Sequence, residues 1–270
     1  MKIEEIVEKL TIKANISLRE DVKKILKKAS HKEKNKKVKR ILEVIMENAR
    51  IALKKNIAIC QDTGLPLVFL EVGRDIDLNS SLIEKINKGV ISGYKKAGFR
   101  KSTIDERGKL SYTPEIFHID FVNAKGLKIT VFPKGFGSEA KSALKVFPPS
   151  AKREEIDEFI METVKNADID ACPPYFIGIG IGGDSSFALI LAKKALCEDL
   201  SRPNRDKELD KWEKNLMRKL NKLGIGIMEK KGSTVLAVRI KRFPTHIAGI
   251  PVGVNISCHA LRSATVKINF

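Results

Sequence analysis

Three of the four cysteines in this chain lie in short turns that follow apolar segments. The turns read Cys60-Gln-Asp-Thr-Gly, Cys172-Pro-Pro and Ser257-Cys258-His259. Three converging thiolates form the ligand set of an iron–sulfur cluster that leaves one iron open as a Lewis acid. The alternative for each cysteine is a small buried hydrophobic residue. A zinc site is disfavoured because the sequence has no Cys-x-x-Cys pair.

Asp62 and His246 are the titratable groups best placed for proton transfer near these turns. Asp62 follows Cys60 by two residues, and His246 precedes Cys258 by 12 residues, among glycines and prolines. Either side chain can move a proton beside a metal centre. The alternatives are an Asx-turn role for Asp62 and a buried, hydrogen-bonded imidazole for His246.

A glycine-rich segment, Gly178-Ile-Gly-Ile-Gly-Gly, matches the G-x-G-x-x-G pattern of dinucleotide-binding proteins. It follows a predicted strand and precedes a predicted helix. The next predicted element is a second helix, however, and not the strand that completes a βαβ unit. A Rossmann site is therefore disfavoured. The free N–H groups of such a loop equally suit anionic sulfides or carboxylates.

Composition indicates a globular protein, since 43% of the 270 residues are hydrophobic and 31% are charged. No apolar run approaches the roughly 18 residues that span a bilayer, and the N-terminus lacks the apolar segment of a signal peptide. We therefore expect a cytoplasmic protein with reduced thiols and no membrane association. The net charge of +18 fits solvated lysines, an anionic substrate, an acidic partner subunit or nucleic acid. Nucleic acid is disfavoured because only 6% of the residues are aromatic.

The spacing of apolar residues predicts an α+β protein. Residues 1–56 repeat apolar residues at helical spacing, which predicts a helical N-terminal section of two or three helices. Further helices are predicted at 78–99, 142–146, 153–167, 185–200 and 209–223, and strands at 67–72, 118–122, 127–133, 175–181, 235–240 and 266–270. The strands at 118–122 and 127–133 are expected to pair antiparallel, and residues 135–139 are expected to form a loop. With neither a repeat nor a low-complexity linker, residues 1–270 are expected to form one domain.

Four motifs occur in order between about residue 52 and the C-terminus. They are Cys60-Gln-Asp-Thr-Gly, Lys134-Gly-Phe-Gly-Ser-Glu, Cys172-Pro-Pro-Tyr-Phe-Ile-Gly and His246-Ile-Ala-Gly-Ile-Pro-Val-Gly-Val-Asn-Ile-Ser-Cys258. Together they resemble the alpha subunit of class I (iron–sulfur) fumarate hydratases and the related L-tartrate dehydratases. The resemblance implies a mixed α/β cluster-binding domain in which Cys60, Cys172 and Cys258 hold a [4Fe–4S] cluster. Cys197 matches no ligand of the family and is expected in the core.

The resemblance also implies roles for residues around the cluster. The positions that match substrate-binding residues of the family are Gln61, Asp62, Arg100 and Gly137. His246 matches the active-site histidine, and His246 and Asp62 are expected to be the catalytic pair. Phe136 departs from the family, which commonly has glycine there, so the path of that loop is expected to differ.

By this resemblance the chain is expected to be the alpha subunit of a hydro-lyase that reversibly hydrates fumarate to (S)-malate, with the substrate carboxylate and hydroxyl bound at the open iron. L(+)-tartrate dehydratase, which produces oxaloacetate, is the second expectation, and a basic nucleic-acid-binding protein is a remote third. Single-chain relatives carry the carbon base in a C-terminal domain, whereas this chain ends at Phe270. We therefore expect a beta subunit to supply that domain, in an α2β2 assembly. The expected substrate is a small dicarboxylate.

Overall fold

The computed structural model describes residues 2–113, 115–227 and 232–269. The chain divides into two compact units. Unit 1 comprises residues 1–19, 47–136 and 262–270, and unit 2 comprises residues 20–46 and 137–261. Each unit has its own four-stranded sheet. The expectation that residues 1–270 act as one hydro-lyase domain stays a prediction.

The helices are α1 (Ile3–Ile16), α2 (Glu20–Lys32), α3 (Lys36–Lys55), α4 (Ser80–Lys96), α5 (Phe136–Glu139), α6 (Arg153–Ala167), α7 (Ser185–Leu196) and α8 (Lys207–Asn221). The strands are β1 (Leu65–Gly73), β2 (Thr103–Ile104), β3 (Leu110–Ser111), β4 (Ile116–Val122), β5 (Leu127–Lys134), β6 (Ala143–Phe147), β7 (Tyr175–Gly183), β8 (Val235–Thr245), β9 (Ile250–Ser257) and β10 (Ala264–Ile268). The α+β class and the helical N-terminal section are confirmed. None of the helices among the described residues is long and apolar enough to cross a membrane.

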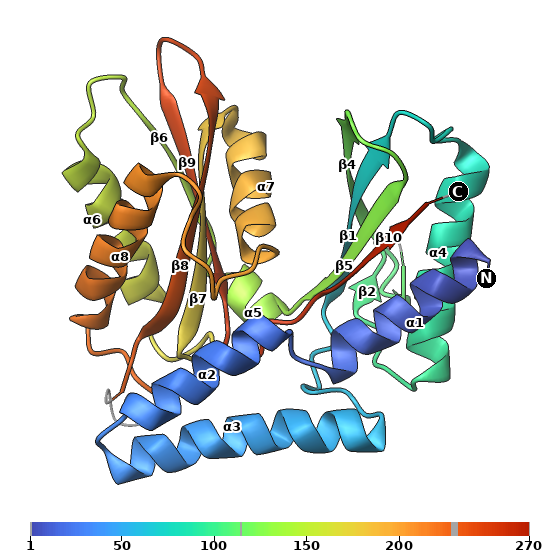
Figure 1. The fold of residues 1–270 in the computed structure, drawn as a ribbon, viewed down its shortest axis with the longest axis horizontal. Helices are drawn as coiled ribbons and strands as arrows, with labels where there is room; N and C mark the ends of the chain where they lie inside the picture. Colours follow the sequence, from blue (N-terminus) through green and yellow to red (C-terminus); the bar gives the residue numbers. More distant parts are fainter. Residues whose placement is uncertain (1, 114, 228–231, 270) are drawn as a thin grey trace. The chain divides into compact units, whose positions relative to one another are not determined.

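Unit 1 is a sheet in the order β10-β5-β1-β4, covered on one face by α1 and α4 (Figure 1). Alternate residues of β1 and β5, such as Leu70 and Ile129, join Val7 of α1 and Ile86 of α4 in a common core. Burying such side chains stabilises the unit by about 1.5–3 kcal/mol each. The predicted antiparallel pairing of 118–122 with 127–133 is wrong. β1 lies between these strands, parallel to β4 and antiparallel to β5, so the turn after β4 crosses over β1.

Unit 2 has three layers, with a sheet in the order β6-β9-β7-β8 between α7 on one face and α6 with α8 on the other (Figure 1). Ile177 and Ile179 of β7 face the core that contains Ile160 of α6 and Leu216 of α8. β8 is parallel to β7, and the chain connects the two strands through α7 and α8. The second helix therefore belongs to a crossover between parallel strands, which the sequence pattern did not reveal.

The glycine-rich segment of β7 serves helix packing. A Cβ at Gly178 would lie 2.0 Å from the carbonyl oxygen of Ala192, and one at Gly180 would lie 2.0 Å from that of Ala188. Both carbonyls belong to α7, so only glycine allows this helix to lie so close to the strand. This function explains the motif without a nucleotide.

Four further expectations differ from the structure. A helix was expected at 142–146, but residues Ala143–Phe147 form the edge strand β6 and pair with β9. Residues 135–139 contain the short helix α5 in place of a loop. The strand expected at 235–240 continues to Thr245 and β9 begins at Ile250, so the Gly- and Pro-rich stretch before Cys258 is largely strand. The expected strand at 266–270 begins earlier, at Ala264, and Phe270 lies outside the described residues.

Candidate active site

The Cys60 turn connects α3 to β1 in unit 1, and the side chain of Asp62 holds this turn to Phe136. Asp62 Oδ1 accepts from the backbone N–H of Gly64 at 2.9 Å, which is the expected Asx turn. Its Oδ2 accepts from the N–H of Phe136 at 2.8 Å. Hydrogen bonds to a charged group contribute about 1.5–3 kcal/mol each. One carboxylate therefore holds the turn of the predicted ligand Cys60 to Phe136 within unit 1.

Hydrogen bonds of Tyr94 and Thr63 stabilise the same turn. The buried hydroxyl of Tyr94 donates to the carbonyl oxygens of Thr63 at 2.9 Å and Gly64 at 3.2 Å. Burial raises the pKa of Tyr94 to about 12, so the hydroxyl keeps its proton at neutral pH. Thr63 Oγ1 in turn donates to the carbonyl oxygen of Arg100 at 3.0 Å. Unit 1 thus places the exposed side chain of Arg100 on a segment bonded directly to the Cys60 turn.

Arg262 completes this support. The residue is only 4% exposed, and its guanidinium donates to the carbonyl oxygen of Asp62. Its Nε has no hydrogen-bond partner among the described residues. A buried guanidinium with an unused N–H beside Asp62 makes this part of unit 1 attractive to an anion.

The Cys172 and Cys258 turns lie against each other in unit 2. His259, which directly follows Cys258, donates its backbone N–H to the carbonyl oxygen of Cys172 at 3.3 Å. Its ring Nδ1 lies 3.1 Å from the same oxygen. Desolvation of the ring lowers the pKa of His259, which favours the neutral imidazole with a proton on Nδ1 to donate to this carbonyl. Cys172 is exposed and adopts a positive φ of 58°, and Cys258 is partly buried at the end of β9.

His246 lies at the exposed turn between β8 and β9. Its Nδ1 accepts from the N–H of Ala248 at 3.1 Å, and its carbonyl oxygen accepts from the N–H of Gly249 at 3.2 Å. When Nδ1 is an acceptor, the proton of the neutral imidazole resides on Nε2. The alternative of a buried imidazole is wrong, because this ring presents an Nε2–H donor on an exposed turn.

The helix α5 is anchored to β9 by a buried polar network. Asn255, which is 0% exposed, donates from Nδ2 to Glu139 Oε2 and to Ser142 Oγ, each at 2.8 Å. Glu139 also forms an ion pair with Lys193 of α7. Gly137 lies within the anchored helix, and a Cβ built on it would meet no atom within 4 Å. The space beside this backbone is therefore open.

The predicted site residues thus gather in two groups. Unit 1 holds Cys60, Gln61, Asp62 and Arg100, whereas unit 2 holds Gly137, Cys172, His246 and Cys258. Cys197 ends α7 as its C-cap and is partly buried, away from every motif turn in sequence. None of the four cysteines forms a disulfide with another described residue. No three His, Cys, Asp or Glu side chains within the described ranges meet as a metal-binding group.

Several supporting residues escaped prediction from the sequence. In the sequence, Tyr94 and Arg262 have no feature that distinguishes them from other helix and loop residues. Only the tertiary contacts reveal their hydrogen bonds to the Cys60 turn. His259 offered a signal, since a histidine directly after a candidate ligand is a candidate hydrogen-bond partner. Asn255 offered another, because a polar residue inside the apolar pattern of a strand requires a partner.

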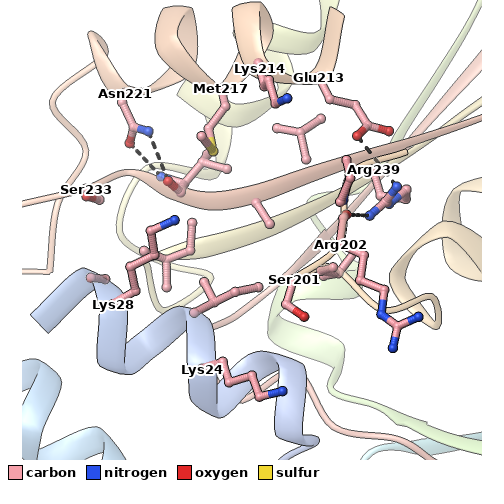
Figure 2. Close-up of a pocket in the computed structure, with 18 of the residues that line it drawn as sticks. Lys24, Lys28, Ser201, Arg202, Glu213, Lys214, Met217, Asn221, Ser233 and Arg239 are labelled. Carbon is pink, nitrogen blue, oxygen red and sulfur yellow. Dashed lines mark hydrogen bonds and ion pairs between the residues drawn. The ribbon is translucent and has the colours of Figure 1, made fainter. Parts of the chain in front are cut away.

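A cavity of about 760 Å³ in unit 2 contains none of these residues. It lies between α2, α8 and β8 and is lined by basic and apolar side chains (Figure 2). The predicted site and this cavity are separate features of the unit.

A family model described as fumarate hydratase (fumerase) matches residues 4–267. The chain therefore belongs to this family of hydro-lyases, which confirms the resemblance seen in the motifs. A relative in Methanocaldococcus jannaschii, named "Putative L(+)-tartrate dehydratase subunit alpha", is 39% identical over 99% of this chain and 98% of its own length. The L(+)-tartrate dehydratase subunit alpha of Escherichia coli K12 is 28% identical over 99% of this chain and 91% of its own length. Both relatives are named as alpha subunits, which implies a partner subunit in those enzymes.

Proposed function

We propose that the chain is the cluster-binding alpha subunit of a [4Fe–4S]-dependent hydro-lyase that interconverts (S)-malate and fumarate. The observation that carries the proposal is the contact between the Cys172 and Cys258 turns through His259, with N–H to oxygen distances within hydrogen-bonding range. Two cysteines on turns that contact each other are suited to sharing a cluster. Cys60 is proposed as the third ligand.

The donor set fits an iron–sulfur cluster. Cys60, Cys172 and Cys258 form no disulfide within the described residues, and each lies on a turn and not inside a helix or strand. Thiolates are the ligands that iron–sulfur clusters take, and three of them leave one iron without a protein ligand. When bound, the cluster would supply a Lewis acid that polarises the substrate hydroxyl and carboxylate.

The chain's own residues would bind and orient the dicarboxylate. Arg100 is exposed, and its planar fork suits a carboxylate. Gln61 is also exposed and supplies amide hydrogen bonds. The open space beside Gly137 allows the substrate to approach the backbone of α5. Together these groups offer both charge and close contact to a small dianion.

Asp62 and His246 are proposed to handle the proton at the substrate oxygen. The two carboxylate oxygens of Asp62 each accept one backbone N–H, which leaves lone pairs for a hydroxyl or a water molecule. His246 presents Nε2–H, which can donate a hydrogen bond to the substrate hydroxyl and orient it. The carbon base and the remaining carboxylate contacts are proposed to come from a beta subunit, in an α2β2 assembly.

Tartrate is the second candidate substrate, because relatives covering the whole chain carry tartrate dehydratase names. Tartrate differs from malate by one hydroxyl, and the proposed contacts serve either molecule. The test is to purify the chain anaerobically with its beta subunit and to compare initial rates on (S)-malate and L(+)-tartrate. A higher kcat/KM on malate supports the proposal. A higher value on tartrate transfers it to tartrate dehydration, and no dehydration of either overturns it.

A further inference from the structure

The cavity of unit 2 has no role in the proposed dehydration. Its volume of about 760 Å³ falls within the range of roughly 300–1,000 Å³ typical of small-molecule sites. We propose that it binds an organic polyphosphate, a molecule that combines two or more phosphates with an apolar body. The proposal is independent of the substrate of the hydro-lyase.

A row of lysines on α2 forms one wall of the cavity. Lys24, Lys28 and Lys32 recur every fourth residue and all line it. With a rise of 1.5 Å per residue, the row extends for about 12 Å along one face of the helix. Figure 2 shows Lys28 reaching from α2 toward β8. A row of charges of this length suits a chain of phosphates better than it suits a single carboxylate.

The acidic residues of the cavity do not neutralise this row. Asp210 forms an ion pair with Lys214 at 2.6 Å. Glu213 is buried, accepts from the N–H of Ile240 at 2.8 Å, and lies 3.8 Å from Arg239. Each of these two carboxylates thus interacts with residues of α8 or β8. Glu20 and Asp199, which lie near Lys24, are paired with Lys23 and Arg202. The α2 side of the cavity therefore keeps a positive charge that an anion can neutralise.

Apolar side chains cover part of the opposite wall, beside the polar groups of α8 and β8. Leu200, Met217 and Val238 line it, and Figure 2 shows Met217 reaching from α8 toward β8. Both ends of the Asn221 amide bond the backbone of Val235, at 3.0 Å each. This wall therefore offers apolar contact area, and the amide of Asn221 is already bonded to the backbone. Met217 adds a polarisable sulfur that suits a flat or a chain-like body.

The experiment measures binding to the full chain by titration calorimetry, with three probes. ATP carries an aromatic body, geranyl diphosphate carries an aliphatic body, and tripolyphosphate carries no body. Lys24→Ala/Lys28→Ala removes two charges inside the cavity. Lys23→Ala/Lys27→Ala is the matched control, because it removes the same charge from α2 at positions that do not line the cavity.

The expected result is that ATP or geranyl diphosphate binds more tightly than tripolyphosphate. Whichever of the two binds more tightly shows whether the cavity prefers an aromatic or an aliphatic body. The cavity variant should weaken that binding about tenfold, equivalent to about 1.4 kcal/mol, while the control changes it less than about twofold. Met217→Ser should weaken the organic probe and leave tripolyphosphate unchanged. Equal losses in both double variants, equal binding of all three probes, or no binding at millimolar concentration would overturn the proposal.

Discussion

At the scale of single residues, several side chains of the predicted site form hydrogen bonds to the backbone of its turns. Asp62 matched a substrate-binding position, and its structural bonds to Gly64 and Phe136 show that it also fixes the Cys60 turn. The Asx-turn interpretation and the functional one are therefore compatible. A carboxylate already held by two N–H groups loses little conformational entropy when it meets a substrate.

Gly137 allows a substrate contact to be tested without disturbing the fold. A Cβ at this position meets no atom within 4 Å, and α5 is helical, where alanine is favoured over glycine. Gly137→Ala should therefore leave the free energy of unfolding within about 0.5 kcal/mol of the wild type. If the substrate approaches this backbone, the methyl group should raise KM for the dicarboxylate. An unchanged KM would remove Gly137 from the site.

Tyr94 gives a prediction about pH. Its pKa is raised to about 12 from the ordinary value of 10.0, so the folded protein keeps the hydroxyl proton where the unfolded chain loses it. The stabilisation is fully present below pH 10 and declines as the pH rises toward 12. Tyr94→Phe should lower the free energy of unfolding by about 1–2 kcal/mol at pH 8. Urea unfolding at rising pH should show the difference between wild type and variant shrinking above pH 10; a constant difference would contradict this account.

At the scale of elements, the packing of α7 on β7 explains the most misleading motif in the sequence. The glycines of 178–183 read as a nucleotide loop, yet Gly178 and Gly180 make room for the carbonyls of α7. Gly180→Ala should cost about 3 kcal/mol or more, because the atom opposed is backbone and cannot rotate away. The measurement is urea unfolding beside Gly137→Ala, a glycine variant with open space. Equal stability of the two variants would show that α7 moves easily.

The sequence predicted elements better than it predicted their pairing. The helix at Arg153–Ala167 and the strand beginning at Tyr175 match their predicted positions because their apolar spacing is strong. The order β5-β1-β4 was missed because β4 and β5 are adjacent in sequence, and no local pattern encodes an inserted strand. β6 was missed for a related reason, since its pairing with β9 is a long-range contact. The site was predictable where motifs mark it, at the cysteines, but not where distant residues such as Arg262 support it.

At the scale of the whole molecule, membership of the fumarate hydratase family defines the reaction class, and the alpha-subunit names of its relatives point to a divided enzyme. The net charge of +18 is consistent with an acidic partner subunit, since complementary charge speeds association. The lysine row of α2 shows that part of this charge also lines a cavity.

A divided active site predicts the behaviour of the chain by itself. The reconstituted alpha chain alone should dehydrate (S)-malate negligibly, because the carbon base is expected on the beta subunit. Adding that subunit should restore turnover, as measured by the ultraviolet absorbance of fumarate. Full turnover by the alpha chain alone would mean that it carries a complete site.

The central claim is that Cys60, Cys172 and Cys258 hold an iron–sulfur cluster, and anaerobic reconstitution tests it most directly. Wild type and Cys197→Ser should both develop the broad absorption shoulder at about 400 nm that thiolate-bound iron–sulfur centres give. Changing any one of the three proposed ligands to serine should abolish it. A full shoulder in one of those three variants, or its loss in Cys197→Ser, would contradict the account.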